Sequence, residues 1–198
     1  YHTHSQEAFK DSGPQGRTIV EVGDYLAELL TQKGYRVYHD TSVYDLQSGV
    51  LDRSKAYNYA LEGVNRILQQ NPSIQVVLDL HRDGVSENLH MVSDINGKPT
   101  AQIMFFNGLS RTPEGKIAYL PNPYLAENLA FSLKMQLGAQ AYFPGFARKI
   151  YLKGLRYNLH LRPKSALIEA GAQTNTFEEV KNAMEPLAQL LDMVLQGE

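Results

Sequence analysis

The spacing of apolar and polar residues along the chain predicts four helices. In the first two, apolar residues recur every three or four positions, which is the period of a helix with one buried face. Gly34 ends the first helix and Asn71-Pro72 ends the second. Thr176 and Glu179 form a capping box at the start of the last. The predicted helices are 18–33, 52–70, 121–137 and 177–195.

Shorter runs of branched and aromatic residues predict strands between these helices. The run 74–80 is almost continuously apolar, as expected for a central strand with both faces covered. Asn96-Gly97 is a strong turn signal, so 89–92 and 102–106 are expected to form a hairpin pair. A loop is expected at 12–16. The other predicted strands are 1–4, 36–39, 149–152 and 165–169.

This alternation predicts a single α/β domain over residues 1–198, with a mixed, mostly parallel central sheet and helices on both faces. A content of 43% hydrophobic and 20% charged residues excludes a disordered or fibrous chain. The net charge of −2 gives no broad basic surface, so no nucleic-acid partner is expected. The absence of cysteine excludes disulfides, thiolate metal sites and cysteine nucleophiles. The chain begins at Tyr1 rather than at a methionine, so we expect any membrane anchor or export signal to lie outside it.

Three predicted strands end in a residue that can bind a metal or carry a proton: His4, His81 and Glu169. Glu7 follows His4 by three residues. In sheets of this type, functional groups gather just beyond the carboxyl ends of the strands. We therefore expect these side chains to meet at one edge of the sheet, although they are far apart in the sequence.

Two imidazoles and one carboxylate, with a fourth position open, form the usual catalytic zinc site. His4, Glu7 and His81 supply that ligand set, and Glu169 remains to carry a proton from water to a leaving amine. Each residue alone also has an ordinary explanation, as a polar strand end or a solvated carboxylate. Glu169 is harder to explain in that way, because it directly follows the apolar run 166–168 and needs a partner or a function there.

Other polar residues near these positions are candidates for contact with a substrate. Arg82 is placed to hold a substrate carboxylate and Asp83 to orient a ligand ring, although a plain salt bridge explains both equally well. Polar stretches on either side of Glu169 are suited to lining a groove for a polar polymer. The candidate residues in those stretches are Arg156, Asn158 and Gln173.

Three segments together resemble the stage II sporulation protein P family, which are bacterial cell-wall hydrolases related to the zinc-dependent N-acetylmuramoyl-L-alanine amidases. The segments are Tyr1-His2-Thr3-His4-Ser5-Gln6-Glu7-Ala8-Phe9, Asp79-Leu80-His81-Arg82-Asp83 and Leu167-Ile168-Glu169-Ala170-Gly171-Ala172-Gln173-Thr174-Asn175-Thr176. By position, His4 and His81 match the family's zinc histidines, and Glu169 matches its catalytic glutamate. The resemblance spans nearly the whole chain.

The resemblance implies a zinc enzyme that cuts the amide between the lactyl group of N-acetylmuramic acid and L-alanine in peptidoglycan. It also implies action at the outer face of the membrane during spore engulfment, beside a lytic transglycosylase, stage II sporulation protein D. In the wider amidase group the glutamate ligand lies further along the chain, which leaves Glu21 as the alternative to Glu7. A zinc carboxypeptidase or endopeptidase acting on stem peptides stays open, as does a non-catalytic wall-binding module.

Overall fold

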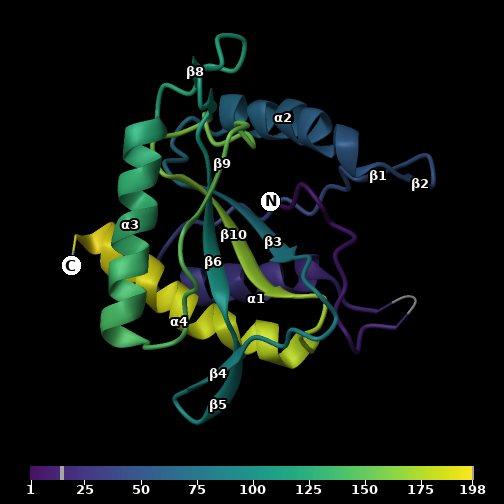
Figure 1. Cartoon of the computed structure of the whole chain (residues 1–198), viewed down its shortest axis with the longest axis vertical. Coiled ribbons are helices and arrows are strands. Elements are labelled where there is room, and N and C mark those ends of the chain that lie inside the picture. Colours follow the sequence, from purple (N-terminus) through teal and green to yellow (C-terminus); the bar gives the residue numbers. More distant parts are fainter. Residues whose placement is uncertain (14–15, 198) are drawn as a thin grey trace.

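The computed structural model describes residues 1–13 and 16–197 of the chain (Figure 1). Residues 14 and 15 of the loop expected at 12–16 lie outside the described residues. The helices are α1 (Ile19–Gln32), α2 (Arg53–Gln70), α3 (Leu125–Tyr142) and α4 (Phe177–Gln196). The central sheet contains β3 (Val77–Asp83), β6 (Ile103–Gly108), β9 (Tyr151–Lys153) and β10 (Ser165–Ala172). The two-stranded pairs are β1 (Leu46–Gln47) with β2 (Val50–Leu51), β4 (Val92–Ile95) with β5 (Lys98–Ala101), and β7 (Arg111–Thr112) with β8 (Gly115–Lys116).

The central sheet is mixed, in the order β3-β10-β6-β9. Two of its pairs, β3 with β10 and β6 with β9, are parallel, and β10 with β6 is antiparallel. Glu169 of β10 lies opposite His81 of β3 on one side and Met104 of β6 on the other. The predicted α/β class and mixed sheet are confirmed, and the register places Glu169 and His81 side by side.

The two faces of the sheet have different coverings. Ile168, with its register neighbours Leu80 and Phe105, belongs to the main core, which also takes in apolar side chains of α1, α3 and α4. Figure 1 shows α1 and α4 running side by side along the sheet. Because side chains alternate along a strand, His81 and Glu169 point to the opposite face. There, α2 packs through Val64 and other apolar residues against the start of β3.

The helix boundaries follow the capping signals. Thr18 and Glu21 form a capping box at the start of α1, and Thr176 and Glu179 form the expected one at the start of α4. The prediction that the third helix begins at residue 121 was wrong, because α3 begins only at Leu125. The sequence Pro121-Asn122-Pro123 accounts for the delay, since a residue that precedes proline is disfavoured in the helical conformation.

Two predicted strands are absent from the described residues: 1–4 forms an extended segment and a turn, and 36–39 is irregular. The first of these still runs beside β3, because the Leu80 N–H donates a hydrogen bond to the Tyr1 carbonyl oxygen. The pairing of 89–92 with 102–106 was also wrong. The Asn96-Gly97 turn instead joins β4 to β5, and the apolar run that follows becomes β6 of the central sheet. None of the helices in the described residues is both long enough and apolar enough to cross a membrane.

Candidate active site

His4 and Glu7 lie on a tight turn at the start of the chain, where the Glu7 N–H donates to the His4 carbonyl oxygen. That turn brings His4 Nδ1 to 3.3 Å from Glu7 Oε1. Asp45 supports the turn from a neighbouring loop, because its carboxylate accepts hydrogen bonds from the Ser5 hydroxyl at 2.8 Å and the Gln6 N–H at 3.1 Å. The His-x-x-Glu spacing therefore directs both side chains to the same point.

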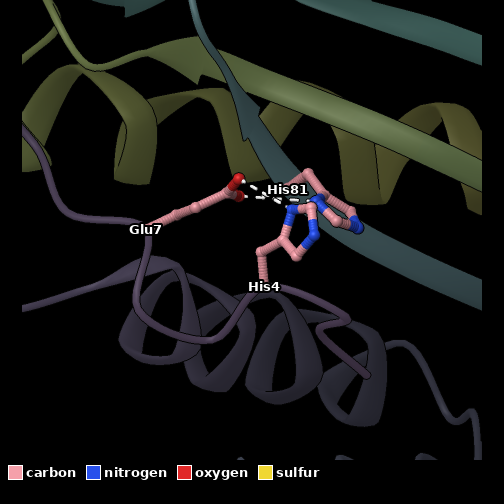
Figure 2. Close-up of side chains that lie close together, drawn as sticks. All are labelled: His4, Glu7 and His81. Carbon is pink, nitrogen blue, oxygen red and sulfur yellow. Dashed lines mark ion pairs between the residues drawn. The ribbon is translucent and has the colours of Figure 1, made fainter. Parts of the chain in front are cut away.

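His81 reaches that point from β3 (Figure 2). Its Nδ1 atom lies 3.4 Å from Glu7 Oε2, and its ring centroid lies 4.9 Å from that of His4. One potential ligand atom from each of His4, Glu7 and His81 lies within 4.8 Å of the other two. Each imidazole thus presents its Nδ1 atom to a different oxygen of one carboxylate.

The charges at this point are strongly coupled. Burial alone would raise the pKa of Glu7, but His81, the hydrogen bonds from both histidines and the Arg82 N–H hold it well below its usual range. Burial alone would lower the pKa of His81, but Asp79 and Glu7 raise it well above the ordinary value for histidine. Glu7 and His81 therefore each favour the charged form of the other.

The donor set fits a zinc ion. It consists of two imidazole nitrogens and one carboxylate, which is the protein ligand set of many catalytic zinc sites. Nε2 of His4 is buried and has no hydrogen-bond partner in the described part of the chain. Glu7 Oε2 accepts the Arg82 N–H at 2.9 Å, which fixes the carboxylate in place. The chemistry and the proximity of these three residues therefore fit a zinc ion.

Asp79 is a component of the site that the sequence analysis did not identify. Its carboxylate is fully buried and lies 2.9 Å from Nε2 of His81. It also accepts hydrogen bonds from the Thr3 N–H at 2.9 Å and the Thr3 hydroxyl at 2.6 Å. A carboxylate on the far nitrogen of a histidine fixes the tautomer and orientation of a metal-binding ring. Its place two residues before His81, on the same face of a strand, was an available signal.

Glu169 lies on the strand next to His81 and is half-buried. Burial raises its pKa to about 7, the negative charges of Glu7, Asp83 and Asp79 act in the same direction, and His81 acts against them. A carboxyl group with a pKa near neutrality can both accept and return a proton.

Tyr57 of α2 covers the two histidines and was also missed. Its ring lies edge-on to His4, with centroids 5.5 Å apart, and nearly parallel to His81, with centroids 6.4 Å apart. Tyr157 contacts Tyr57 from the other side at 5.4 Å. Burial raises the pKa of Tyr57, and the carboxylates of the site raise it further. Nothing in the sequence indicates that α2 crosses this face of the sheet.

His2 points away from His4 and takes part in a separate hydrogen-bonded chain. Its Nδ1 atom lies 2.8 Å from the Leu80 carbonyl oxygen, and its Nε2 atom lies 2.8 Å from Nε2 of His39. Asp24 of α1 contacts the other nitrogen of His39 at 2.9 Å. These hydrogen bonds connect the segment that carries His4 to α1 and to β3.

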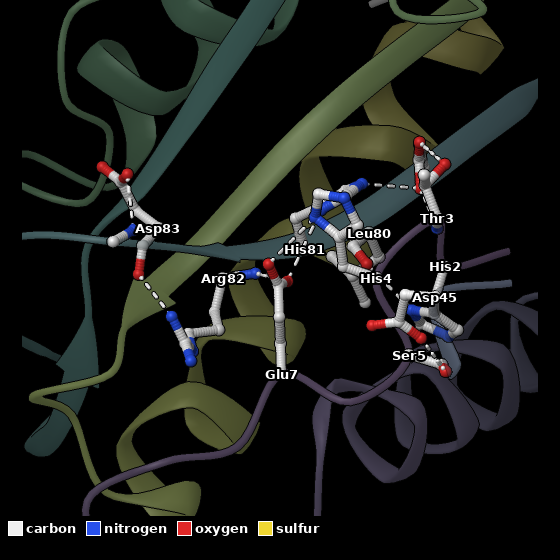
Figure 3. A network of polar contacts seen from close by, with 12 residues as sticks. His2, Thr3, His4, Ser5, Glu7, Asp45, Leu80, His81, Arg82 and Asp83 are labelled. Atoms are coloured by element: carbon white, nitrogen blue, oxygen red, sulfur yellow. Dashed lines mark hydrogen bonds and ion pairs between the residues drawn. The ribbon is translucent and has the colours of Figure 1, made fainter. Parts of the chain in front are cut away.

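The other polar candidates mainly hold the backbone around the site (Figure 3). Arg82 donates from Nε to the Ala8 carbonyl oxygen at 2.9 Å. Asp83 forms an ion pair with Arg148 at 2.7 Å instead of orienting a ligand ring.

Glu21, the alternative ligand, is not among the three converging residues, because its carboxylate accepts the Thr18 N–H in the cap of α1. The remaining three substrate-binding candidates donate to protein oxygens. Arg156 donates to the Pro121 carbonyl oxygen, Asn158 to that of Tyr57, and Gln173 to that of Val85.

Comparison with known proteins identifies a relative of this chain. Stage II sporulation protein P of Bacillus subtilis (strain 168) is 23% identical over 207 residues, covering 95% of this chain and 48% of the relative. The chain thus spans about half the length of that relative.

Two solved structures share the fold at low identity. N-acetylmuramoyl-L-alanine amidase AmiC2 of Nostoc punctiforme is similar over 98% of this chain and 94% of its own, with a TM-score of 0.55 and 15% identity. The CwlD amidase of Clostridioides difficile, solved in complex with the GerS lipoprotein, is similar over 96% of this chain and 89% of its own, with a TM-score of 0.58 and 15% identity. The family model of stage II sporulation protein P (SpoIIP) matches residues 1–192, and the chain therefore belongs to that family.

Proposed function

We propose that this chain is the catalytic domain of a zinc-dependent hydrolase that cuts the amide between N-acetylmuramic acid and L-alanine in peptidoglycan during sporulation. The observation that carries the proposal is the convergence of His4, Glu7 and His81 on one point, with Glu169 on the neighbouring strand. Membership of the sporulation family and the amidase fold support the choice of substrate.

His4, Glu7 and His81 would hold the zinc ion, and Asp79 would keep the Nε2 atom of His81 protonated so that Nδ1 is free to bind. Zinc bound in this way polarises a carbonyl group and makes water acidic enough to attack it near neutral pH. The protein's own part is to fix the His81 ring through its contact with Asp79 and the Glu7 carboxylate through the Arg82 N–H.

Glu169 is the proton carrier in this proposal. Its carboxylate takes a proton from the attacking water and gives it to the amide nitrogen as the carbon–nitrogen bond breaks. The products are a free lactyl carboxyl group and a peptide with a free amino terminus at L-alanine. A pKa of about 7 suits both halves of this transfer near neutral pH.

The substrate that we propose is a polymer. Two hollows of the described surface, one beside Val64 and Leu68 and the other beside Arg162 and Pro163, do not include the three candidate ligands. We place the substrate on the face of the sheet that carries His81 and Glu169. Arg156 is our candidate for direct contact, since its guanidinium is only partly engaged.

Arg82, Asn158 and Gln173 would shape the same surface through their bonds to the backbone. We further propose that the domain works outside the cytoplasm, held at the outer face of the membrane by a region beyond this chain. A lytic transglycosylase related to stage II sporulation protein D is the partner we propose for it there.

Elemental analysis and one digestion test this function. The purified chain is expected to carry one zinc ion and to release lactyl-terminated glycans and L-alanine-terminated peptides from purified peptidoglycan, as identified by mass spectrometry. Glu169→Gln should keep zinc and lose turnover. Shortened or uncrosslinked peptides with intact lactyl amides would indicate a peptidase, and a zinc-free, inactive protein would indicate a wall-binding module.

The choice between the two carboxylate ligands has a matched test. Glu7→Gln removes the carboxylate that faces both histidines, so it should lose zinc. Glu21→Gln is the control, because glutamine preserves the capping contact of α1. Loss of zinc in Glu21→Gln with retention in Glu7→Gln would reverse the assignment.

A further inference from the structure

Tyr57 lies against two of the candidate zinc ligands, and its hydroxyl is a free hydrogen-bond donor. Its ring contacts His4 and His81, as described above, and the residue is only half-buried. Its hydroxyl has no hydrogen-bond partner among residues 1–13 and 16–197, whereas its backbone carbonyl oxygen accepts the Asn158 side-chain amide at 2.8 Å. A polar hydroxyl left unpaired at a candidate reaction centre is available to a ligand.

Few other polar groups at this point are free to donate a hydrogen bond to a substrate. Glu7 and Asp79 are carboxylates that only accept, and the two imidazoles are directed to Glu7. A phenol with the ordinary pKa of about 10 is protonated at neutral pH and therefore donates. Tyr57 thus supplies a neutral O–H group on a ring that lies beside two of the candidate ligands.

A donor of this kind assists amide hydrolysis. As water adds to the carbonyl carbon, negative charge develops on the carbonyl oxygen, and donors fixed in advance at that position stabilise the transition state. Resting on the function proposed above, we propose that the Tyr57 hydroxyl donates a hydrogen bond to the scissile carbonyl oxygen as that charge develops. Tyr57 is then a catalytic residue in addition to Glu169.

The backbone around Tyr57 holds it in place. Tyr157 and Asn158 are consecutive residues with positive φ angles of 51° and 55°. Residues other than glycine rarely adopt this conformation, although asparagine does so more often than most. The strained pair puts the Tyr157 ring against Tyr57 and the Asn158 amide on its carbonyl oxygen. Strain of this kind persists only where the surrounding structure enforces it, and it is concentrated at functional sites.

Replacement of Tyr57 by phenylalanine tests the role of the hydroxyl, because the ring and its packing are kept. Tyr57→Phe should lower kcat for release of lactyl groups by about 10- to 100-fold, since a hydrogen bond to a developing charge is lost. KM, zinc content and melting temperature should stay at wild-type values. Tyr59→Phe is the matched control on the exposed side of the same helix, and it should leave kcat unchanged.

A phosphinate analogue of the muramoyl–alanine amide gives a second readout that a purely structural role would not change. Its tetrahedral anion resembles the transition state, so Tyr57→Phe should weaken its binding by the same factor as it lowers kcat/KM. A kcat within twofold of wild type in Tyr57→Phe, or a loss of zinc that explains the lower rate, would overturn the proposal. Failure of the wild-type protein to cut the lactyl amide would instead overturn the function on which it rests.

Discussion

The bond between Asp79 and His81 allows a quantitative prediction for Asp79→Asn. In the wild-type protein the carboxylate accepts the Thr3 N–H and hydroxyl and lies against Nε2 of His81, all in a fully buried position. Asparagine offers one acceptor oxygen in place of two and turns an N–H₂ group toward donors. The substitution therefore removes support from the His81 ring and leaves a buried donor unpaired.

The expected magnitudes follow from these contacts. Loss of a carboxylate behind a metal-binding histidine lowers metal affinity about 10- to 100-fold, or about 1.4 to 2.8 kcal/mol. The unpaired buried donor lowers the free energy of unfolding by about 1 to 3 kcal/mol. The first quantity is read from zinc dissociation constants measured by competition with a chelator. The second is read from denaturant unfolding of the metal-free protein.

Asp40→Asn is a matched control, because Asp40 is also a buried carboxylate that accepts a backbone N–H and two hydroxyls. Its donors are Ser42 through N–H and hydroxyl, at 3.1 and 2.6 Å, and the Tyr44 hydroxyl at 2.5 Å. It should lose comparable stability and keep wild-type zinc affinity. Equal zinc affinity in Asp79→Asn and Asp40→Asn would refute the role given to Asp79.

Three further predictions concern pH and packing. The value of kcat/KM should fall as pH drops through the pKa of Glu169. The midpoint should lie at or below about 7, because a bound cation lowers that pKa. Glu169→Gln should be inactive at every pH. Zinc affinity should rise with pH, because His81 has a raised pKa without the metal and must lose its proton to bind it. Calorimetry in buffers of different ionisation enthalpy should detect the released proton, and binding without proton release would contradict this prediction. Gly63→Ala should lower the free energy of unfolding by about 1 to 3 kcal/mol, and the melting temperature with it, because the new Cβ would overlap the buried Tyr44 hydroxyl. Gly84→Ala is the control and should have little effect, because its Cβ would meet no atom within 4 Å.

The sequence predicted the parts of the fold that depend on local pattern. The period of apolar residues identified the first two helices, and the run 165–169 became the first part of β10, which lies between β3 and β6. The error at 102–106 has a physical cause. Asn96-Gly97 fixes a two-residue turn, so the strand that pairs with Val92–Ile95 must follow at once, and the next apolar run is left for the central sheet.

The convergence of His4, Glu7 and His81 was predicted partly for the right reason, because the His-x-x-Glu spacing directs two of these side chains to one point. The expectation that these residues end strands was wrong, because 1–4 forms no strand and His81 and Glu169 lie inside β3 and β10. Tyr57 was not predictable, because its position depends on where α2 crosses the sheet, which is set by long-range packing of Val64 and Leu68. The positive φ of Tyr157 was not predictable either, since tyrosine does not signal that conformation, whereas Asn158 is of a residue type that adopts it more often.

Anomalous diffraction at the zinc absorption edge, from crystals of the zinc-loaded chain, tests the central claim most directly. The account predicts one strong peak bounded by His4, Glu7 and His81, within about 2.0 to 2.2 Å of a nitrogen of each histidine and an oxygen of the glutamate. A peak at any other group of residues, or no peak from protein that hydrolyses peptidoglycan, would contradict it.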